Sequence, residues 1–132
     1  MEMKLELVPI PVADVDRAKA FYVDKLGFNL DHDVNPGNGM RVVQLTPPGS
    51  ACSIVIGTGM PEIAKMQPGS SKAIHLVVAD ARKAREMLVS RGIEVGEIDE
   101  HDAGIKYVSF SDPDGNSWLF QEMPWRAADF KS

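Results

Sequence analysis

The sequence predicts an α+β fold built from two tandem βαβββ units whose curved sheets enclose a trough. Three observations predict this fold. The chain repeats itself at an offset of 66 residues, each copy has a helical segment with start and stop signals, and short strand-like segments parted by turn residues follow each helix. At 132 residues, the chain has the length of one ordinary domain. We therefore expect a single domain over residues 1–132.

The repeat covers a strand, a helix and a turn without a gap. Residues 12–14 and 78–80 both read Val-Ala-Asp, and the sign of the charges is kept along the helices that follow. Three further matches at the same offset are Val42 with Val108, Pro47 with Pro113, and Gly49 with Gly115. Agreement at one offset over several kinds of element favours a duplicated unit over chance.

The first copy begins with an apolar run at residues 5–12, which predicts a buried strand. Asp14 is placed to cap a helix with its carboxylate, and Gly27 is placed to end that helix. Between them, apolar side chains recur at helical spacing at Val15, Ala18, Phe21, Tyr22 and Leu26. Turn residues then separate three expected strands near residues 29–34, 40–45 and 52–56.

The second copy repeats this order, with a helix expected between Asp80 and Gly92. Its strands are expected near residues 73–78, 94–98, 105–110 and 117–122. The parts are a first unit at residues 1–57, a linker at 58–72, a second unit at 73–123 and a tail at 124–132. Each helix covers only one face of its sheet, so the second copy is the expected partner for the other face.

Composition excludes several function classes. The net charge of −5 argues against a nucleic-acid partner, since phosphate binding requires a clustered basic excess. No apolar run reaches the roughly 18 residues of a membrane span, and the first residues lack the pattern of a signal peptide. Cys52 is the single cysteine and has no internal disulfide partner. These features predict a cytoplasmic protein with no membrane partner.

The chain resembles the vicinal oxygen chelate superfamily in three segments. They are Val-x-Asp ahead of a helix with Phe21 and Tyr22, the sequence Leu-Gly-Phe at residues 26–28, and Phe-Ser-Asp-Pro-Asp-Gly-Asn-Ser-Trp at residues 110–118. This superfamily includes glyoxalases, bleomycin-type resistance proteins and extradiol dioxygenases. The resemblance covers residues 5–122 and implies a glyoxalase-like fold, a homodimer and, in the enzymes, one divalent metal in the trough. It does not imply one reaction, because one fold hosts many functions.

The resemblance also implies where metal ligands would lie. One ligand lies seven residues before each helix-opening Asp, and another lies three residues after the Asn of the Asp-Pro-Asp-Gly-Asn turn. Those positions hold Leu7, Ala73, Leu119 and, at the matching offset in the first copy, Ser53. Divalent metals need nitrogen, sulfur or oxygen donors, which three of the four residues lack. We therefore expect no metal and no other cofactor.

The pleat of a strand predicts which residues share a face with these positions, because residues two apart point the same way. The expected ligand-binding residues are Leu7, Pro9, Ser53, Ala73, His75, Tyr107, Leu119 and Gln121, with Arg41 as a further polar neighbour. The opposite faces carry apolar residues such as Trp118 and Phe120, which suit a core packed against the helices.

Other polar residues have simpler interpretations. His75 is the candidate catalytic residue, and two roles remain open: a partner or general base for a ligand, or a partly exposed structural histidine. His32 and His101 each lie between acidic residues, which is typical of a solvated acidic surface. Cys52 is expected to be a packed, inert thiol.

These observations favour a protein that binds a small, partly apolar molecule in the trough without transforming it. The alternative is a lyase, isomerase or dioxygenase of the same superfamily, with a shifted metal site or with metal-free acid–base chemistry at His75. A third hypothesis is a partner-binding module in which the trough has no role, and no specific residue supports it.

Overall fold

The computed structural model describes residues 1–130, which form two compact units. The first unit consists of Met1–Ser71 together with Pro113–Asn116. The second consists of Lys72–Asp112 and the described chain from Ser117 onward. The expected tail at residues 124–132 ends in two residues that lie outside the described part.

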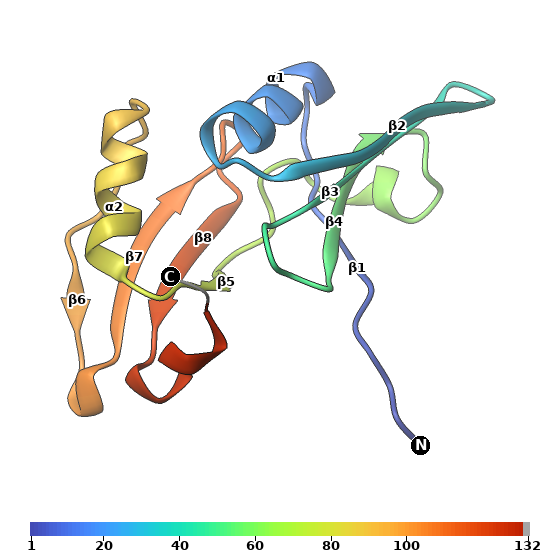
Figure 1. Ribbon diagram of the computed structural model, residues 1–132. Coiled ribbons are helices and arrows are strands. Elements are labelled where there is room, and N and C mark those ends of the chain that lie inside the picture. Colours follow the sequence, from blue (N-terminus) through green and yellow to red (C-terminus); the bar gives the residue numbers. More distant parts are fainter. Residues whose placement is uncertain (131–132) are drawn as a thin grey trace. The chain divides into compact units, whose positions relative to one another are not determined.

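The first unit contains a four-stranded mixed sheet in the order β1-β4-β3-β2 (Figure 1). Strand β1 is parallel to β4, and the other neighbours are antiparallel. In chain order the elements are β1 (Leu7–Pro9), α1 (Val15–Ala20), a π-helical turn (Phe21–Lys25), β2 (Asn29–Gly37), β3 (Met40–Thr46), β4 (Ser53–Thr58) and a 3₁₀ turn (Ile63–Lys65).

The second unit repeats this arrangement in the strand order β5-β8-β7-β6, again with the first and last strands parallel. Its elements are β5 (Ile74–Val77), α2 (Ala81–Ser90), β6 (Asp99–Glu100), a 3₁₀ turn (Asp102–Gly104), β7 (Lys106–Ser111), β8 (Ser117–Glu122) and a second 3₁₀ turn (Pro124–Asp129). The predicted α+β class with two βαβββ units is confirmed. The enclosed trough stays a prediction.

Both helices begin and end at the predicted residues. Asp14 Oδ1 accepts the Arg17 backbone N–H at 3.1 Å, and Asp80 Oδ1 accepts that of Lys83 at 3.1 Å. Gly27 and Gly92 both have a φ of 78°, a left-handed conformation that glycine adopts without steric cost.

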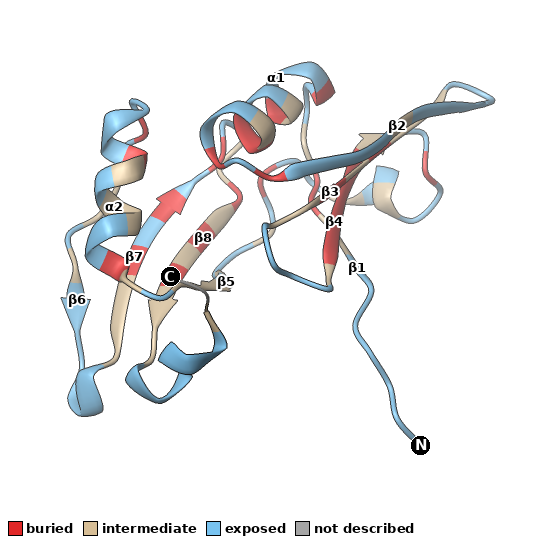
Figure 2. Cartoon of the chain, in the orientation of Figure 1, coloured by how far each residue is buried: buried red, intermediate tan, exposed pale blue. Residues whose placement is uncertain are grey.

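One face of each sheet packs against its own helix. In the first sheet this face carries Val43, Leu45, Ile54 and Ile56, which are all buried, and α1 packs against β4 (Figure 2). In the second sheet, α2 packs against β7 and β8. The buried side chains there are Val108, Phe110, Trp118 and Phe120, and the rings of Phe110 and Trp118 stack with centroids 6.4 Å apart. The predicted core face is therefore confirmed in both units.

The strand expected near residues 94–98 is wrong in its position. The chain first touches β7 only through an isolated bridge between Val95 and Phe110 and a bond from Gly96 N to Ser109 O of 2.9 Å. A Cβ at residue 96 would lie 2.6 Å from Ser109 Oγ, so glycine permits this close approach. Regular pairing begins at Asp99 and Glu100, which form β6.

The constant offset of 66 is also wrong beyond the helix. Val8 and Ile74 are 66 residues apart, but their partners Ile54 and Trp118 are only 64 apart. In the middle strands, the partners of Ile54 and Trp118 are Leu45 and Phe110, which are 65 apart. The connection between β3 and β4 is longer than that between β7 and β8, which shifts the correspondence. The Pro and Gly matches in that turn therefore do not mark equivalent positions.

The Asp-Pro-Asp-Gly-Asn segment fastens the first unit together. Asn116 is fully buried; its Nδ2 donates to Pro11 O at 2.8 Å and its Oδ1 accepts the Ser71 N–H at 3.1 Å. Asp114 Oδ1 accepts the Ala13 N–H at 3.1 Å. A Cβ at Gly69 would lie 2.1 Å from Asp114 O, so this approach requires glycine. No helix within residues 1–130 is long and apolar enough to cross a membrane.

Candidate functional site

His75 lies on β5 and is exposed. Its Nδ1 lies 2.7 Å from the carbonyl oxygen of Ala73, a residue with a positive φ of 56°. A carbonyl oxygen can only accept, so Nδ1 must carry the hydrogen of this bond. In the neutral imidazole, Nε2 then holds a lone pair that can accept a hydrogen bond or a proton.

Tyr107 lies beside His75 and joins it to Gln121. The rings of His75 and Tyr107 meet edge to face, with centroids 5.9 Å apart. Gln121 is the cross-strand partner of Tyr107, and its Nε2 donates to Tyr107 Oη at 3.1 Å. The hydroxyl hydrogen of Tyr107 can then be donated to another acceptor, and Gln121 Oε1 can accept.

Apolar side chains share this face. Leu119 is the register partner of His75, and Val77 is the register partner of Gln121. All are exposed or half-buried. We call this surface the His75 face; it consists of His75, Val77, Tyr107, Leu119 and Gln121. It therefore unites four of the predicted ligand-binding residues on a single sheet.

His101 is a neighbour of this face that the sequence analysis missed. Its ring meets that of Tyr107 edge to face at 5.3 Å, and its Nε2 lies 3.0 Å from Asp99 Oδ2. The sequence places His101 in an acidic surface turn, which agrees with its exposure. The contact with Tyr107 arises because Asp99 pairs with Tyr107 across β6 and β7, and that pairing could not be foreseen with the sixth strand misplaced.

The remaining predicted residues lie on the first sheet. Leu7 pairs with Ser53, and Pro9 pairs with Val55, so they share a face. Ser53 is 4% exposed, whereas Leu7 is 38% exposed. The Ser53 hydroxyl lies 2.6 Å from that of Thr46, which in turn donates to Asp31. A carboxylate only accepts, so Ser53 donates to Thr46 and keeps only lone pairs for other partners.

This chain of hydroxyls also affects Asp31. The hydrogen bond from Thr46, followed by that from Asn29, lowers the pKa of the Asp31 carboxyl below its usual range. His32, which the sequence places on an acidic surface, lies in β2 with Nε2 3.2 Å from Gln44 Oε1. Both side chains therefore have local partners.

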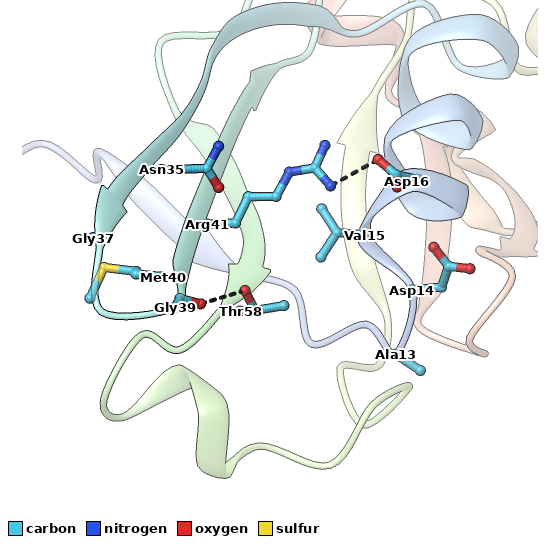
Figure 3. A pocket seen from close by; sticks show the side chains of 10 residues that line it. All are labelled: Ala13, Asp14, Val15, Asp16, Asn35, Gly37, Gly39, Met40, Arg41 and Thr58. Atoms are coloured by element: carbon cyan, nitrogen blue, oxygen red, sulfur yellow. Dashed lines mark hydrogen bonds and ion pairs between the residues drawn. The ribbon is translucent and has the colours of Figure 1, made fainter.

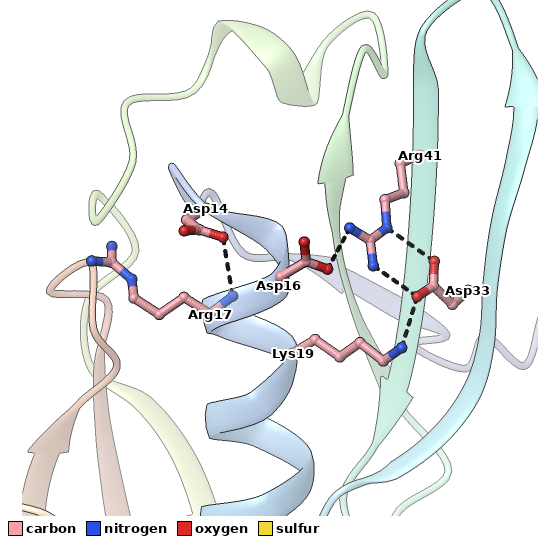
Figure 4. A network of polar contacts seen from close by, with 6 residues as sticks. All are labelled: Asp14, Asp16, Arg17, Lys19, Asp33 and Arg41. Carbon is pink, nitrogen blue, oxygen red and sulfur yellow. Dashed lines mark hydrogen bonds and ion pairs between the residues drawn. The ribbon is translucent and has the colours of Figure 1, made fainter.

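Arg41 does not share a face with the predicted ligand-binding residues. Its guanidinium lies on the α1 side of the first sheet, where it binds Asp33 through two nitrogens at 3.0 and 2.8 Å and Asp16 at 2.8 Å (Figure 4). Lys19 Nζ also binds Asp33, at 2.8 Å. These hydrogen bonds from Arg41 and Lys19 hold the pKa of Asp33 well below its usual range, and Asp33 raises that of Arg41.

A hollow of about 570 Å³ lies next to this cluster in the first unit. Figure 3 shows the Arg41 side chain reaching across it toward Asp16. Its lining consists of Ala13, Asp14, Val15, Asp16, Asn35, Gly37, Gly39, Met40, Arg41 and Thr58. None of the predicted ligand-binding residues lines it. Its main charged groups already bind one another or cap α1, which favours a structural role.

Known proteins match both the sequence and this fold. Residues 4–120 match the family described as Glyoxalase/Bleomycin resistance protein/Dioxygenase superfamily. The chain belongs to this superfamily. The predicted family resemblance is thereby confirmed.

Similar members of the superfamily include proteins of several bacteria. TnmS3, an antibiotic binding protein from Streptomyces sp. CB03234, is 32% identical, with a TM-score of 0.81 over 92% of this chain and 97% of that chain. A superfamily member from Sphaerobacter thermophilus DSM 20745 is 30% identical, with a TM-score of 0.79 over 92% and 98%. The uncharacterized protein YetH of Bacillus subtilis (strain 168) is 28% identical, covering 92% of this chain and 100% of YetH.

The superfamily's metal positions can now be compared with the register. Because the last strands correspond at an offset of 64, the counterpart of Leu119 in the first unit is Val55 rather than Ser53. Leu7, Val55, Ala73 and Leu119 all have hydrocarbon side chains, so these positions do not fit a metal ion. Within residues 1–130, no group of three or more His, Cys, Asp or Glu side chains is arranged to hold a metal ion elsewhere.

Proposed function

We propose that the protein binds a small, partly apolar organic molecule on the His75 face, without a metal ion at the superfamily's ligand positions. The observation that carries this proposal is the composition of that face, where three polar groups project beside the hydrocarbon of Leu119 and Val77. Small-molecule sites combine an apolar lining with a few placed polar groups in this way. Leu7, Pro9, Ser53 and Ala73 remain predicted ligand contacts.

The polar atoms indicate the chemistry of the guest. His75 Nε2 and Gln121 Oε1 accept, whereas the Tyr107 hydroxyl donates. A guest with a hydroxyl or N–H group and a carbonyl oxygen on an apolar body satisfies all three. The similarity to an antibiotic binding protein supports a guest of antibiotic size and mixed polarity.

One observation favours a second candidate function. The lone pair on His75 Nε2 is available in the Nδ1–H tautomer, so His75 can act as a general base without a metal. This would make the protein a lyase or isomerase. Conversion of the bound molecule, detected by mass spectrometry after incubation, distinguishes this function from binding alone.

We also propose that the protein works as a homodimer. The free edges of both four-stranded sheets support this proposal, because exposed sheet edges favour pairing with another chain.

A panel of antibiotics, with bleomycin as the first probe, tests the proposal by thermal shift and then by calorimetry. We expect saturable binding of at least one compound, unchanged by EDTA, in protein free of stoichiometric zinc, nickel, iron and manganese. One tightly held metal per chain that is lost in His75→Ala, together with no binding of any compound, would overturn the proposal.

A further inference from the structure

Residues 1–6 form an extended segment ahead of β1, which we call the N-terminal arm. All six residues are exposed, and Met1, Met3 and Leu5 have exposed fractions of 108%, 83% and 71%. Figure 1 shows the arm leading away from the sheet of the first unit. The arm is fixed at its base, where Glu6 O accepts the Ser53 N–H at 2.9 Å.

The arm has the pattern of a half-buried strand. Apolar Met1, Met3 and Leu5 alternate with charged Glu2, Lys4 and Glu6, so an extended arm has one apolar and one charged face. A contiguous exposed apolar stripe on an unpaired strand is a surface for another chain.

We propose that the arm pairs with the arm of a second copy of this chain, antiparallel, about a twofold axis at Leu5. This register places Leu5 opposite Leu5 of the partner subunit, and Met3 opposite the partner's Leu7. It also places Lys4 opposite the partner's Glu6, so that opposite charges meet twice. Apolar and oppositely charged cross-strand pairs both stabilise antiparallel strands.

Neighbouring registers are less favourable. An axis at Lys4 places Lys4 opposite Lys4 of the partner subunit and Glu2 opposite the partner's Glu6, which are like charges. An axis at Met3 keeps opposite charges together, but it uses Met1 instead of Leu7. Leu7 already lies in β1 and Glu6 is already bonded to Ser53, so the axis at Leu5 orders less free chain.

This dimer does not depend on ligand binding, so the two proposals fail separately. Cysteine cross-linking tests the register in a Cys52→Ser background, which removes the native thiol. Directly opposed residues of antiparallel strands have Cα atoms about 4.5–5.5 Å apart, within the range of a disulfide. We expect Leu5→Cys to form a covalent dimer with oxidised glutathione, and the matched Met3→Cys and Lys4→Cys variants to remain mostly monomeric on a non-reducing gel.

Preferential cross-linking of Met3→Cys would overturn the axis at Leu5, and no cross-linking of any variant would overturn arm pairing. A charge exchange provides an independent test by analytical ultracentrifugation. We expect Lys4→Glu to weaken self-association about tenfold, because it makes two pairs repulsive, and we expect Glu6→Lys added to it to restore the dimer.

Glu2→Lys is the matched control, because Glu2 has no charged residue opposite it in this register. A double variant as weak as Lys4→Glu alone, or a chain that is monomeric at every concentration, would contradict the proposal.

Discussion

The two units share one order of elements but differ in where their polar groups lie. In the first unit, the charged cluster of Arg41, Asp33 and Lys19 lies on the helix side of the sheet and ties it to α1. In the second unit, that side is filled by aromatic rings, and His75, Tyr107 and Gln121 lie on the opposite face.

The burial of the two faces follows the same division. On the first sheet, Ser53 and Val55 are 4% and 2% exposed, and Ser53 already donates to Thr46. On the second sheet, the His75 face is exposed or half-buried, and His75 Nε2 can accept a bond from a ligand. The comparison teaches that a duplicated unit can keep its core pattern while only one copy retains polar atoms accessible to a guest.

The largest expected effect concerns the aromatic core of the second unit. Trp118 is 1% exposed and stacks on Phe110, so Trp118→Ala should lower the free energy of unfolding by about 3–5 kcal/mol. Urea denaturation measures this loss. Trp125→Ala is the control, because Trp125 is 61% exposed and should change stability by less than about 0.5 kcal/mol. Equal effects of the two substitutions would contradict the assignment of this core.

Leu119→Arg should weaken binding of the tightest compound in the antibiotic panel at least a hundredfold. The substitution places a charged side chain on the apolar part of the His75 face, and a buried charge without a partner is costly. Val89→Arg is the matched control, since Val89 is exposed on α2 and should leave binding unchanged. Calorimetry measures both affinities, and unchanged binding in Leu119→Arg would place the guest elsewhere.

The charged cluster of the first unit should respond to pH. The folded-state pKa of Asp33 is lowered below the value of about 3.9 in the unfolded chain. Asp33 therefore stabilises the fold above that value, and its contribution disappears as the pH falls through the lower, folded-state pKa. Asp33→Asn should cost about 1–3 kcal/mol at neutral pH, and the difference from the unsubstituted protein should shrink in acid.

Urea denaturation of both proteins at neutral and acidic pH measures this difference. Glu62→Gln is the control, because the pair of Glu62 with Lys65 is almost fully exposed and should contribute little at any pH. A cost of Asp33→Asn that stays constant with pH would show that the charge of Asp33 does not stabilise the fold.

The smallest expected effect is that of His75→Ala on binding. Loss of one hydrogen bond to the guest should weaken binding by about 0.5–1.5 kcal/mol, while stability stays nearly unchanged because His75 is exposed. His32→Ala provides the matched histidine on the first sheet and should bind normally. Equal losses in both variants would remove the distinction between the two units.

Local chemistry made much of the fold predictable from the sequence. Asp14 and Asp80 cap their helices because each carboxylate reaches backbone N–H groups three residues away. The alternation along β5 and β8 likewise predicts that His75, Leu119 and Gln121 share a face, which the register confirms. These predictions need only the period of a helix or a strand.

Features that depend on turn length were not predictable. Arg41 and Tyr107 are 66 residues apart and were expected on equivalent faces, but their strands correspond at an offset of 65. A slip of one residue moves a strand residue to the other face, so Arg41 faces α1 whereas Tyr107 joins the His75 face. The contact of His101 with Tyr107 also required the position of β6.

The account's central claim is that the second unit provides the binding face. Backbone amide chemical shifts, recorded by NMR during titration with the tightest compound of the antibiotic panel, test it most directly. The account predicts saturable shifts on β5, β7 and β8, centred on His75, Tyr107, Leu119 and Gln121. Shifts centred instead on Asp14, Asp16 and Arg41, around the hollow of the first unit, would contradict it.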